Sequence, residues 1–447
     1  MTDFERQMQS AGMSGEEASR KGALLVRLKR ELSELCGERV DECCAFFVPG
    51  RVELVGKHTD YGGGRSLVCA IERGICMVAT ARKDAQVRVT EMGRRSGTQF
   101  ALAADAEGAW GDSSNHAITV ARRVARDFPE ARTGADIVFA SDLPPASGMS
   151  SSSALVVGVF FAIAGVNRLS QTASWRFIQS REEQAGYLGA VESGEAFASF
   201  AANRGVGTLG GSEDHVAILC SRAGFLRQYS YCPIRLEKEI RAPATHSLVV
   251  GVSGVKAEKT GNARDSYNRI SVTTSKILEL WRKAAGRNDA SLSAALESSP
   301  DAAKRLRDIV RECEEPEKFP ADVLLNRLNQ FAEESNEIVP GVGEALARVD
   351  LERVGTLVDR SQHLAETCLG NQTRETVDLQ RSARVLGAAA ASAFGAGFGG
   401  SVWALVLADR AREFRDAWAA DYHKRHPELA KASEFLITNA SSGLIQF

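Results

Sequence analysis

Residues 49–64 read PGRVELVGKHTDYGGG, and this segment decides the fold. Several polar side chains are crowded beside its apolar residues: Arg51, Lys57, His58 and Asp60. A charge that leaves water needs a partner or a ligand, so such crowding is typical of a lined cleft. The residue pattern predicts two short strands, one over 44–48, just before the segment, and one over 51–55, within it. The glycines at 62–64 predict a tight turn after the second strand.

A second segment, residues 143–153, reads LPPASGMSSSS and precedes an apolar stretch that predicts a helix over 151–166. Small residues let the backbone approach a phosphate, and the N–H groups at a helix start favour an anion. Serine hydroxyl groups can also reach Mg²⁺. The alternative is an ordinary serine-capped helix. A Walker-type loop is excluded because no Gly-Lys-Ser/Thr follows the glycine.

A third segment, residues 395–400, reads GAGFGG. A dinucleotide-binding loop runs from a strand through glycines into a helix. Here an alanine-rich segment comes first and the apolar residues 401–408 follow, which predict a strand. The order of elements therefore argues against a dinucleotide fingerprint and leaves a phosphate-covering loop or a plain tight turn.

Together, in this order, the three segments resemble the three motifs of the GHMP small-molecule kinases. The first is similar to the galactokinase signature Gly-Arg-Val-Asn-Leu-Ile-Gly-Glu-His-Thr-Asp-Tyr-Asn-Gly-Gly, and the resemblance covers roughly residues 45 to 405. It implies an α+β fold with two domains and an active site in the cleft between them. We place the N-terminal GHMP domain at 1–245 and the C-terminal GHMP domain, with the third motif, at 246–447.

The resemblance also implies where ATP and Mg²⁺ bind. The second and third motifs would hold the triphosphate through Gly148, Met149, Ser150, Ser151, Ser152, Ser153, Gly397 and Gly399. Ser152 falls where the family has its magnesium-binding serine. Glu192 would share the metal ion, with Glu195 as a competitor. On the adenine side Trp110 is a candidate in a poorly matched segment.

The catalytic and sugar-binding residues are likewise implied by the resemblance. Residues 210–215 read GGSEDH and resemble the family's Cys-Gly-Ile-Met-Asp-Gln, which puts the catalytic aspartate on Asp214. The family's arginine beside the reacting oxygen falls on Arg51. The sugar-contacting positions fall on His58, Asp60, Gly211 and Tyr267. Without the resemblance, adjacent carboxylates after a glycine turn are typical of a solvated loop.

Departures from the signature concern charge. Lys57 replaces a sugar-contacting glutamate and Glu53 replaces an asparagine of the signature. Arg65 occupies a position that is usually apolar in the family, and His215 replaces a glutamine. In one interpretation Lys57 contacts a sugar with an anionic or C6-modified substituent. In the other, Glu53 neutralises Lys57 or Arg65 and galactose is still accepted. The sequence leaves both open.

The composition fits an enzyme of ordinary globular type. The chain has 447 residues, 44% of them hydrophobic and 25% charged, and a formal net charge of −2, which argues against non-specific nucleic-acid binding. The polar start predicts no targeting peptide, and no apolar run is long enough for a membrane helix. The nine cysteines are scattered and odd in number, which favours free thiols in a reducing compartment. We expect a cytoplasmic monomer.

The sequence therefore predicts an ATP-dependent sugar kinase that phosphorylates the anomeric hydroxyl group of galactose or a related sugar. One alternative is a GHMP kinase for another alcohol, such as mevalonate or arabinose. The other is a sensor that binds sugar and ATP without catalysis.

Overall fold

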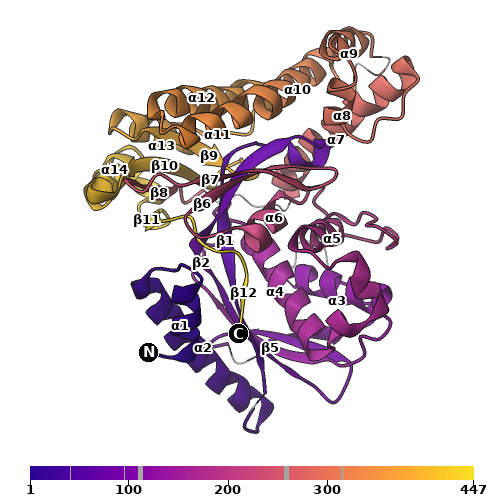
Figure 1. Cartoon of the computed structure of the whole chain (residues 1–447), viewed down its shortest axis with the longest axis vertical. Helices are drawn as coiled ribbons and strands as arrows, with labels where there is room; N and C mark the ends of the chain where they lie inside the picture. Colours follow the sequence, from indigo (N-terminus) through magenta and orange to yellow (C-terminus); the bar gives the residue numbers. More distant parts are fainter. Residues whose placement is uncertain (41, 95, 109–113, 256–260, 314, 316) are drawn as a thin grey trace.

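The computed structural model describes residues 1–447 except 41, 95, 109–113, 256–260, 314 and 316, and it leaves the side chains of 261–264 undescribed. Its described residues form two sheets with helices packed on them, which confirms the predicted α+β class (Figure 1). Trp110, the candidate on the adenine side, lies outside the described residues.

The larger sheet has the order β12-β1-β2-β5-β3-β4, and β6 pairs with both β2 and β7. Neighbouring strands are antiparallel except β3 and β5. Its strands are β1 (Cys44–Val55), β2 (Arg65–Ala81), β3 (Gln86–Glu91), β4 (Thr98–Ala101), β5 (Ala135–Ser141), β6 (Phe225–Ser230), β7 (Arg235–Arg241) and β12 (Ile445–Gln446).

The two strands predicted over 44–48 and 51–55 are one strand, β1, with a register irregularity against β2 between Pro49 and Arg51. Proline has no N–H for the ladder, so an irregularity here is expected. The adjoining Gly50 packs against Leu143 and the Met149 carbonyl oxygen, where a Cβ atom would come within 2.6 Å and 2.9 Å. The irregularity thus brings the first motif against the serine-rich segment.

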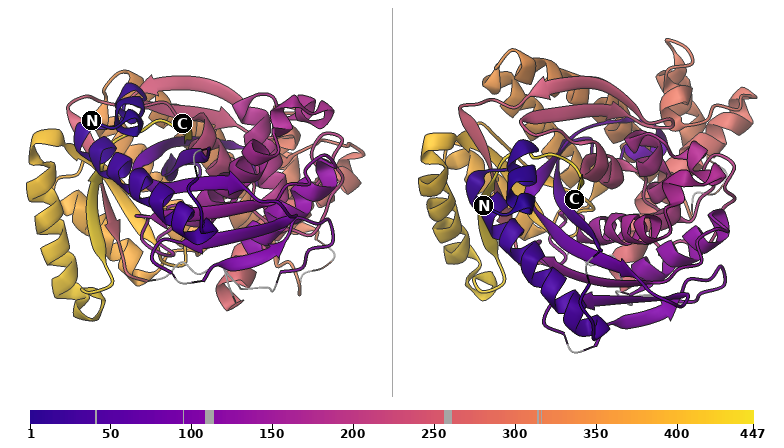
Figure 2. Two further views of the ribbon diagram at one scale, coloured as in Figure 1. Left: turned by 90° about the horizontal axis from the view of Figure 1, so that it is seen from below. Right: turned by 60° about the horizontal axis from the view of Figure 1, so that its bottom comes forward.

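Helices cover both faces of the larger sheet (Figures 1 and 2). Alternate residues of β1 and β2 divide between them: Phe47 and Val78 belong to the core with α2, whereas Val48 and Met77 belong to the core with α4. These helices are α1 (Asp3–Ser10) and α2 (Gly15–Cys36) on one face, and α3 (Asn115–Asp127), α4 (Ser151–Val166), α5 (Arg181–Ser193) and α6 (Glu213–Cys220) on the other.

The smaller sheet has the order β11-β8-β10-β9 and consists of β8 (His246–Val252), β9 (Ala390–Phe394), β10 (Ser401–Leu407) and β11 (Glu434–Thr438). The helices of this part are α7 (Gly261–Ala285), α8 (Leu292–Leu296), α9 (Ala302–Arg311), α10 (Ala321–Glu333), α11 (Val339–Ala347), α12 (Leu351–Leu364), α13 (Arg374–Val385) and α14 (Ala411–Arg425). Short 3₁₀ turns are η1 (Asp60–Gly62), η2 (Leu169–Gln171), η3 (Ala173–Phe177), η6 (Ala408–Arg410) and η7 (Pro427–Leu429), and π-helical segments are η4 (Glu334–Ile338) and η5 (Ala365–Leu369).

The proposed division at 245/246 falls between β7 and β8, where the chain passes from one sheet to the other. The end of the chain crosses back, because β12 pairs with β1. The two sheets also meet directly, since the indole N–H of Trp403 donates to the carbonyl oxygen of Leu54 at 3.2 Å. Among the described residues no helix is long and apolar enough to span a membrane.

Candidate active site

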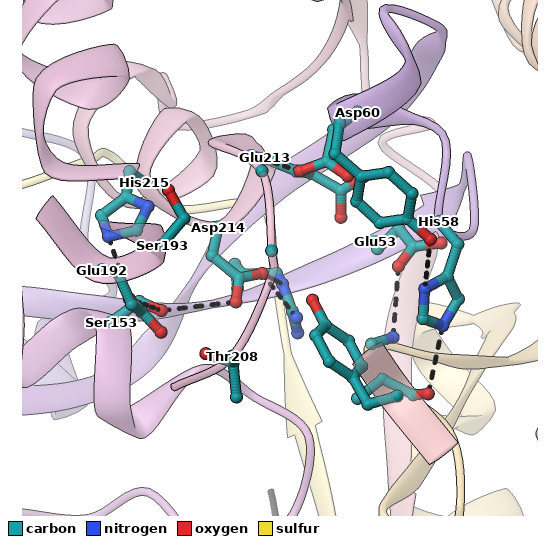
Figure 3. Close-up of a pocket in the computed structure, with 17 residues that line it drawn as sticks. Glu53, His58, Asp60, Ser153, Glu192, Ser193, Thr208, Glu213, Asp214 and His215 are labelled. Atoms are coloured by element: carbon teal, nitrogen blue, oxygen red, sulfur yellow. Dashed lines mark hydrogen bonds and ion pairs between the residues drawn. The ribbon is translucent and has the colours of Figure 1, made fainter. Parts of the chain in front are cut away.

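A cavity lies where β1, η1 and α4–α7 meet the turn of the β9–β10 hairpin (Figure 3). Most of the residues that line it are polar or charged, and they come from each of the sequence motifs. The lining residues are Arg51, Glu53, His58, Asp60, Tyr61, Ser153, Glu192, Ser193, Thr208, Gly210, Gly211, Glu213, Asp214, His215, Tyr267, Gly395 and Ala396.

Arg51 and Asp214, predicted as the catalytic pair, are in direct contact in this cavity. The Arg51 Nε and Nη2 atoms lie 2.7 Å and 2.6 Å from Asp214 Oδ1. Arg51 is buried, and its third nitrogen donates to the carbonyl oxygen of Gly148. Burial lowers the pKa of Arg51, but the nearby Asp214, Glu213 and Glu53 outweigh burial and the net direction is upward. The guanidinium group therefore stays charged beside the carboxylate.

His58 joins the first motif to the third. Its Nε2 atom lies 3.1 Å from the carbonyl oxygen of Ala396, and its Nδ1 atom lies 3.1 Å from the hydroxyl group of Tyr61. A carbonyl oxygen can only accept, so Nε2 carries the proton. The His58 ring also packs against Tyr267, with centroids 5.5 Å apart. The sugar positions predicted at His58 and Tyr267 thus form one wall.

Asp60 and Gly211 form the neighbouring wall. Asp60 Oδ2 accepts a hydrogen bond from the Glu213 backbone N–H at 3.1 Å. A Cβ atom on Gly211 would lie 2.2 Å from that same oxygen, so only glycine allows the start of α6 to approach Asp60 this closely. Burial raises the pKa of Asp60, against the hydrogen bonds from the backbone.

The serine-rich segment forms a loop at the start of α4 that fits a phosphate group. Gly148 and Ser150 both have positive φ, at 78° and 58°, and no side chain caps the helix. The buried Ser150 hydroxyl oxygen has no hydrogen-bond partner among the described residues. Free N–H groups and an unpaired hydroxyl group are what an anion at a helix start uses.

The β9–β10 hairpin closes over this loop. The Ser401 hydroxyl group donates to the carbonyl oxygen of Ser147 at 2.6 Å. Gly397 and Gly399 have positive φ and pack against Asn371 and Val255, while Gly395 and Ala396 line the cavity. The predicted nucleotide-binding segments are therefore brought together, and binding by Gly397 and Gly399 themselves stays a prediction.

Oxygen atoms that could bind a metal ion lie close together beside Asp214. The Ser153 hydroxyl oxygen lies 3.0 Å from Glu192 Oε2 and 3.4 Å from Asp214 Oδ2. Glu192 is buried and lines the cavity, whereas its competitor Glu195 is exposed and outside it. Ser152, predicted as the metal ligand, is half-buried and does not line the cavity. The structure thus places the neighbouring serine, Ser153, at the carboxylates.

Known proteins match each part of this arrangement. The galactokinase galactose-binding signature matches residues 31–81, the GHMP kinases N terminal domain matches 115–189, and the GHMP kinases C terminal matches 344–424. The galactokinase of Chloroflexus aggregans is 29% identical over 405 residues, covering 89% of this chain and 91% of its own length. That of Actinobacillus succinogenes is 26% identical and covers 90% and 94%.

The chain is similar to galactokinases along most of its length and carries matches to GHMP kinase domains.

Solved structures agree with this fold. The galactokinase of Lactococcus lactis, crystallised with galactose, superposes with a TM-score of 0.76 at 21% identity and covers 94% of this chain and 99% of its own. The mevalonate kinase of L. major superposes with a TM-score of 0.51 at 19% identity, covering 89% and 96%. The galactokinase relatives and the GHMP kinase domain match identify this protein as an enzyme that transfers a phosphoryl group to an alcohol.

The Lys57 side chain of this protein does not reach the cavity. Its side chain is 1% exposed, and Nζ donates to the Ser361 hydroxyl group at 2.9 Å. Ser361 in turn donates to Glu334 Oε1 at 2.8 Å, and the same oxygen accepts from the Gly56 N–H at 2.7 Å. The geometry does not bring Lys57 to the predicted substrate contact and supports the interpretation in which the charges rearrange locally.

The other two charged departures, Glu53 and Arg65, have different neighbours. Burial raises the pKa of Glu53 to about 7, while Lys57 and Arg51 act in the opposite direction. Arg65 lies apart, with its Nε atom 2.9 Å from Glu237 Oε1. Lys57, and not Arg65, is therefore the cation that lies near Glu53 and offsets its charge. This agrees with the interpretation in which Glu53 neutralises Lys57.

Sequence reasoning missed the residues that support the first motif from behind. Arg327 of α10 donates to the carbonyl oxygen of His58 and, at 2.8 Å, to the Thr274 hydroxyl group, and Gln330 donates to the carbonyl oxygen of Lys57 at 3.0 Å. In the sequence these residues are polar members of a helical pattern, with no local signal that they are buried. Their partners in the first motif, His58 and Lys57, lie 269 and 273 residues away.

Proposed function

We propose that this protein transfers the γ-phosphate of ATP to the anomeric hydroxyl group of galactose, giving galactose 1-phosphate and ADP. The observation that carries the proposal is the Arg51–Asp214 pair, which sits in a polar cavity directly beside the phosphate-type loop at the start of α4. The match of residues 31–81 to the galactose-binding signature supports galactose as the sugar.

Asp214 serves as the general base in this proposal. Phosphoryl transfer has a loose transition state, so positioning and charge neutralisation supply most of the rate. Arg51 keeps Asp214 ionised, because an opposite charge in contact favours the charged form. Asp214 then accepts the proton of the sugar hydroxyl group as that oxygen attacks phosphorus. Arg51 also faces the developing negative charge, which it stabilises.

ATP and Mg²⁺ fit the residues present. The uncapped start of α4 and the unpaired Ser150 hydroxyl group would hold phosphate oxygens. Ser153 and Glu192 would hold the metal ion. The described residues contain no cluster that would bind a metal by itself, which suits Mg²⁺, an ion held by one or two carboxylates together with substrate phosphates. When bound, Mg²⁺ neutralises charge on the phosphates.

We also infer a reducing, cytoplasmic environment and a monomeric enzyme. All nine cysteines are free thiols, most of them at least partly buried, as expected where disulfides do not form. Size-exclusion chromatography with light scattering would test the oligomeric state, and a mass near the 48.1 kDa of one chain is expected.

A coupled ADP-release assay over a sugar panel tests the proposed function. The panel contains galactose, galacturonate, arabinose, glucose and mevalonate, and phosphorus NMR identifies the product. We expect galactose to give the highest kcat/KM and a 1-phosphate. A preference for galacturonate would favour the interpretation in which Lys57 contacts an anionic substituent of the sugar. Binding of ATP and galactose without any ADP release would instead identify a sensor.

A further inference from the structure

Glu213 is a buried carboxyl group that lines the substrate cavity and has no role in the mechanism above. It is the first residue of α6, next to Asp214, and only 6% of its surface is exposed. Its backbone N–H is bonded to Asp60. Its side chain lines the cavity, where a ligand can reach it. A carboxyl group that is largely removed from water needs a hydrogen-bond partner, and a ligand in the cavity can supply one.

The charges around Glu213 are mainly negative. Glu53 on β1, Asp60 on η1 and the adjoining Asp214 on α6 surround it (Figure 3). Arg51 on β1 and Tyr231 also lie near. Burial raises the pKa of Glu213 well above its ordinary value, and Glu53 and Asp60 add to the rise while Arg51 opposes it. The start of α6 favours the anion by only about 0.3–1 kcal/mol, a smaller effect.

We propose that Glu213 is a substrate-recognition residue whose neutral carboxylic acid donates a hydrogen bond to a ring hydroxyl group of the sugar, an inference that rests on the proposed function. The three neighbouring carboxylates, Glu53, Asp60 and Asp214, can only accept hydrogen bonds when ionised. A hydroxyl group that accepts from Glu213 can still donate to one of them. Glu213 therefore supplies a hydrogen-bond donor among these carboxylates.

Kinetics of Glu213→Met and Glu213→Gln test this role. Methionine removes the hydrogen bond and keeps similar bulk, whereas glutamine keeps a donor and cannot ionise. We expect Glu213→Met to raise KM for galactose by about tenfold, with a smaller change in kcat. Glu213→Gln is expected to raise KM less. KM of the wild type should rise at alkaline pH as the proton is lost, and this rise should vanish in Glu213→Gln.

Deoxygalactoses identify the contacted hydroxyl group. For one of the 2-, 3-, 4- or 6-deoxy sugars, we expect Glu213→Met to cost no further affinity, because the partner is already absent. Circular dichroism and ATP binding establish that each variant is folded.

Three results would overturn the inference. One is an unchanged KM for galactose in Glu213→Met. Because the wild type must turn galactose over for this KM to be compared, the result would contradict the role of Glu213 and leave the proposed function intact. Another is an equal effect of Glu213→Met on all deoxy sugars. The third is a Glu213-dependent preference for galactosamine at pH values where its amine is charged, which would show that Glu213 acts as an anion.

Discussion

Lys57 donates a hydrogen bond to Ser361 at 2.9 Å, although 304 residues of sequence separate them. The contact turns the lysine away from the substrate cavity and into a buried network with Glu334. A position that the galactokinase signature fills with a sugar-contacting glutamate has thus become part of the support for the turn that carries His58 and Asp60.

Lys57→Glu is expected to destabilise the fold without improving the use of galactose. The substitution would replace the cation near Glu53 and Glu334 by a third carboxylate, and a buried charge left without compensation costs about 3–5 kcal/mol. Urea unfolding measures the loss, and Lys304→Glu, on an exposed position of α9, is the control and should change stability by less than about 0.5 kcal/mol. A stable Lys57→Glu protein with a higher kcat/KM for galactose would show that Lys57 faces the sugar.

Ser153→Ala is expected to impair the use of magnesium more than Ser152→Ala. Ser153 contacts Glu192 and Asp214, whereas the Ser152 side chain lies outside the cavity. A Mg²⁺ titration of turnover at fixed ATP should shift to about tenfold higher concentration in Ser153→Ala and remain close to the wild type in Ser152→Ala. The reverse order of effects would return the metal contact to Ser152, as the motif comparison implied.

Gly397→Ala should displace the hairpin that closes the site. Its φ is 78°, and an added Cβ atom would lie 2.4 Å from the carbonyl oxygen of Asn371. We expect a loss of stability above about 1 kcal/mol and a raised KM for ATP. Gly370→Ala is the control, because it has a similar φ of 61° but open space around the new atom, so only the backbone strain is shared. Equal effects of both variants would show that packing against Asn371 is unimportant.

The ionisation of Glu53 should make stability fall as the pH rises. Its pKa is about 7 in the folded protein against an ordinary 4.5, so between these values the folded state binds more protons than the unfolded state. By linkage the stabilisation is present below pH 4.5 and is lost through pH 7, by about 3 kcal/mol. Glu53→Gln should therefore gain stability relative to the wild type between pH 5 and pH 8 in urea unfolding. Glu312→Gln, on the surface, is the control, and parallel pH curves for Glu53→Gln and the wild type would contradict the shift.

Local signals in the sequence were enough for the regular elements with strong periodicity. The apolar pattern of 151–166 predicted α4 and that of 401–408 predicted β10. The polar β7 was missed because a largely exposed strand with five charged residues in RLEKEIR shows little apolar alternation. Residues 342–358 have a helical pattern throughout but belong to two helices, α11 and α12, because Val349 adopts a positive φ of 57° and Asp350 caps α12.

The part of the site that is built from contiguous motifs could be predicted from the sequence. The part that depends on contacts between segments far apart in the sequence could not. Arg51, Asp214, His58 and Asp60 lie together as the motifs implied. The direction of the Lys57 side chain depends on Glu334 and Ser361, which belong to a π-helical segment and a distant helix. Likewise, which serine faces Glu192 depends on the rotation of α4, and a motif that contains four serines in a row cannot fix that rotation.

Turnover of Asp214→Asn tests the central claim most directly. Asparagine keeps the shape of the side chain but cannot accept the hydroxyl proton, and loss of a general base costs about 10²–10⁴ in rate. ADP release with galactose should fall by that factor while ATP binding, measured by calorimetry, stays within a few-fold of the wild type. Turnover close to that of the wild type would contradict the account and move the base to another carboxylate, with Glu213 as the first to examine.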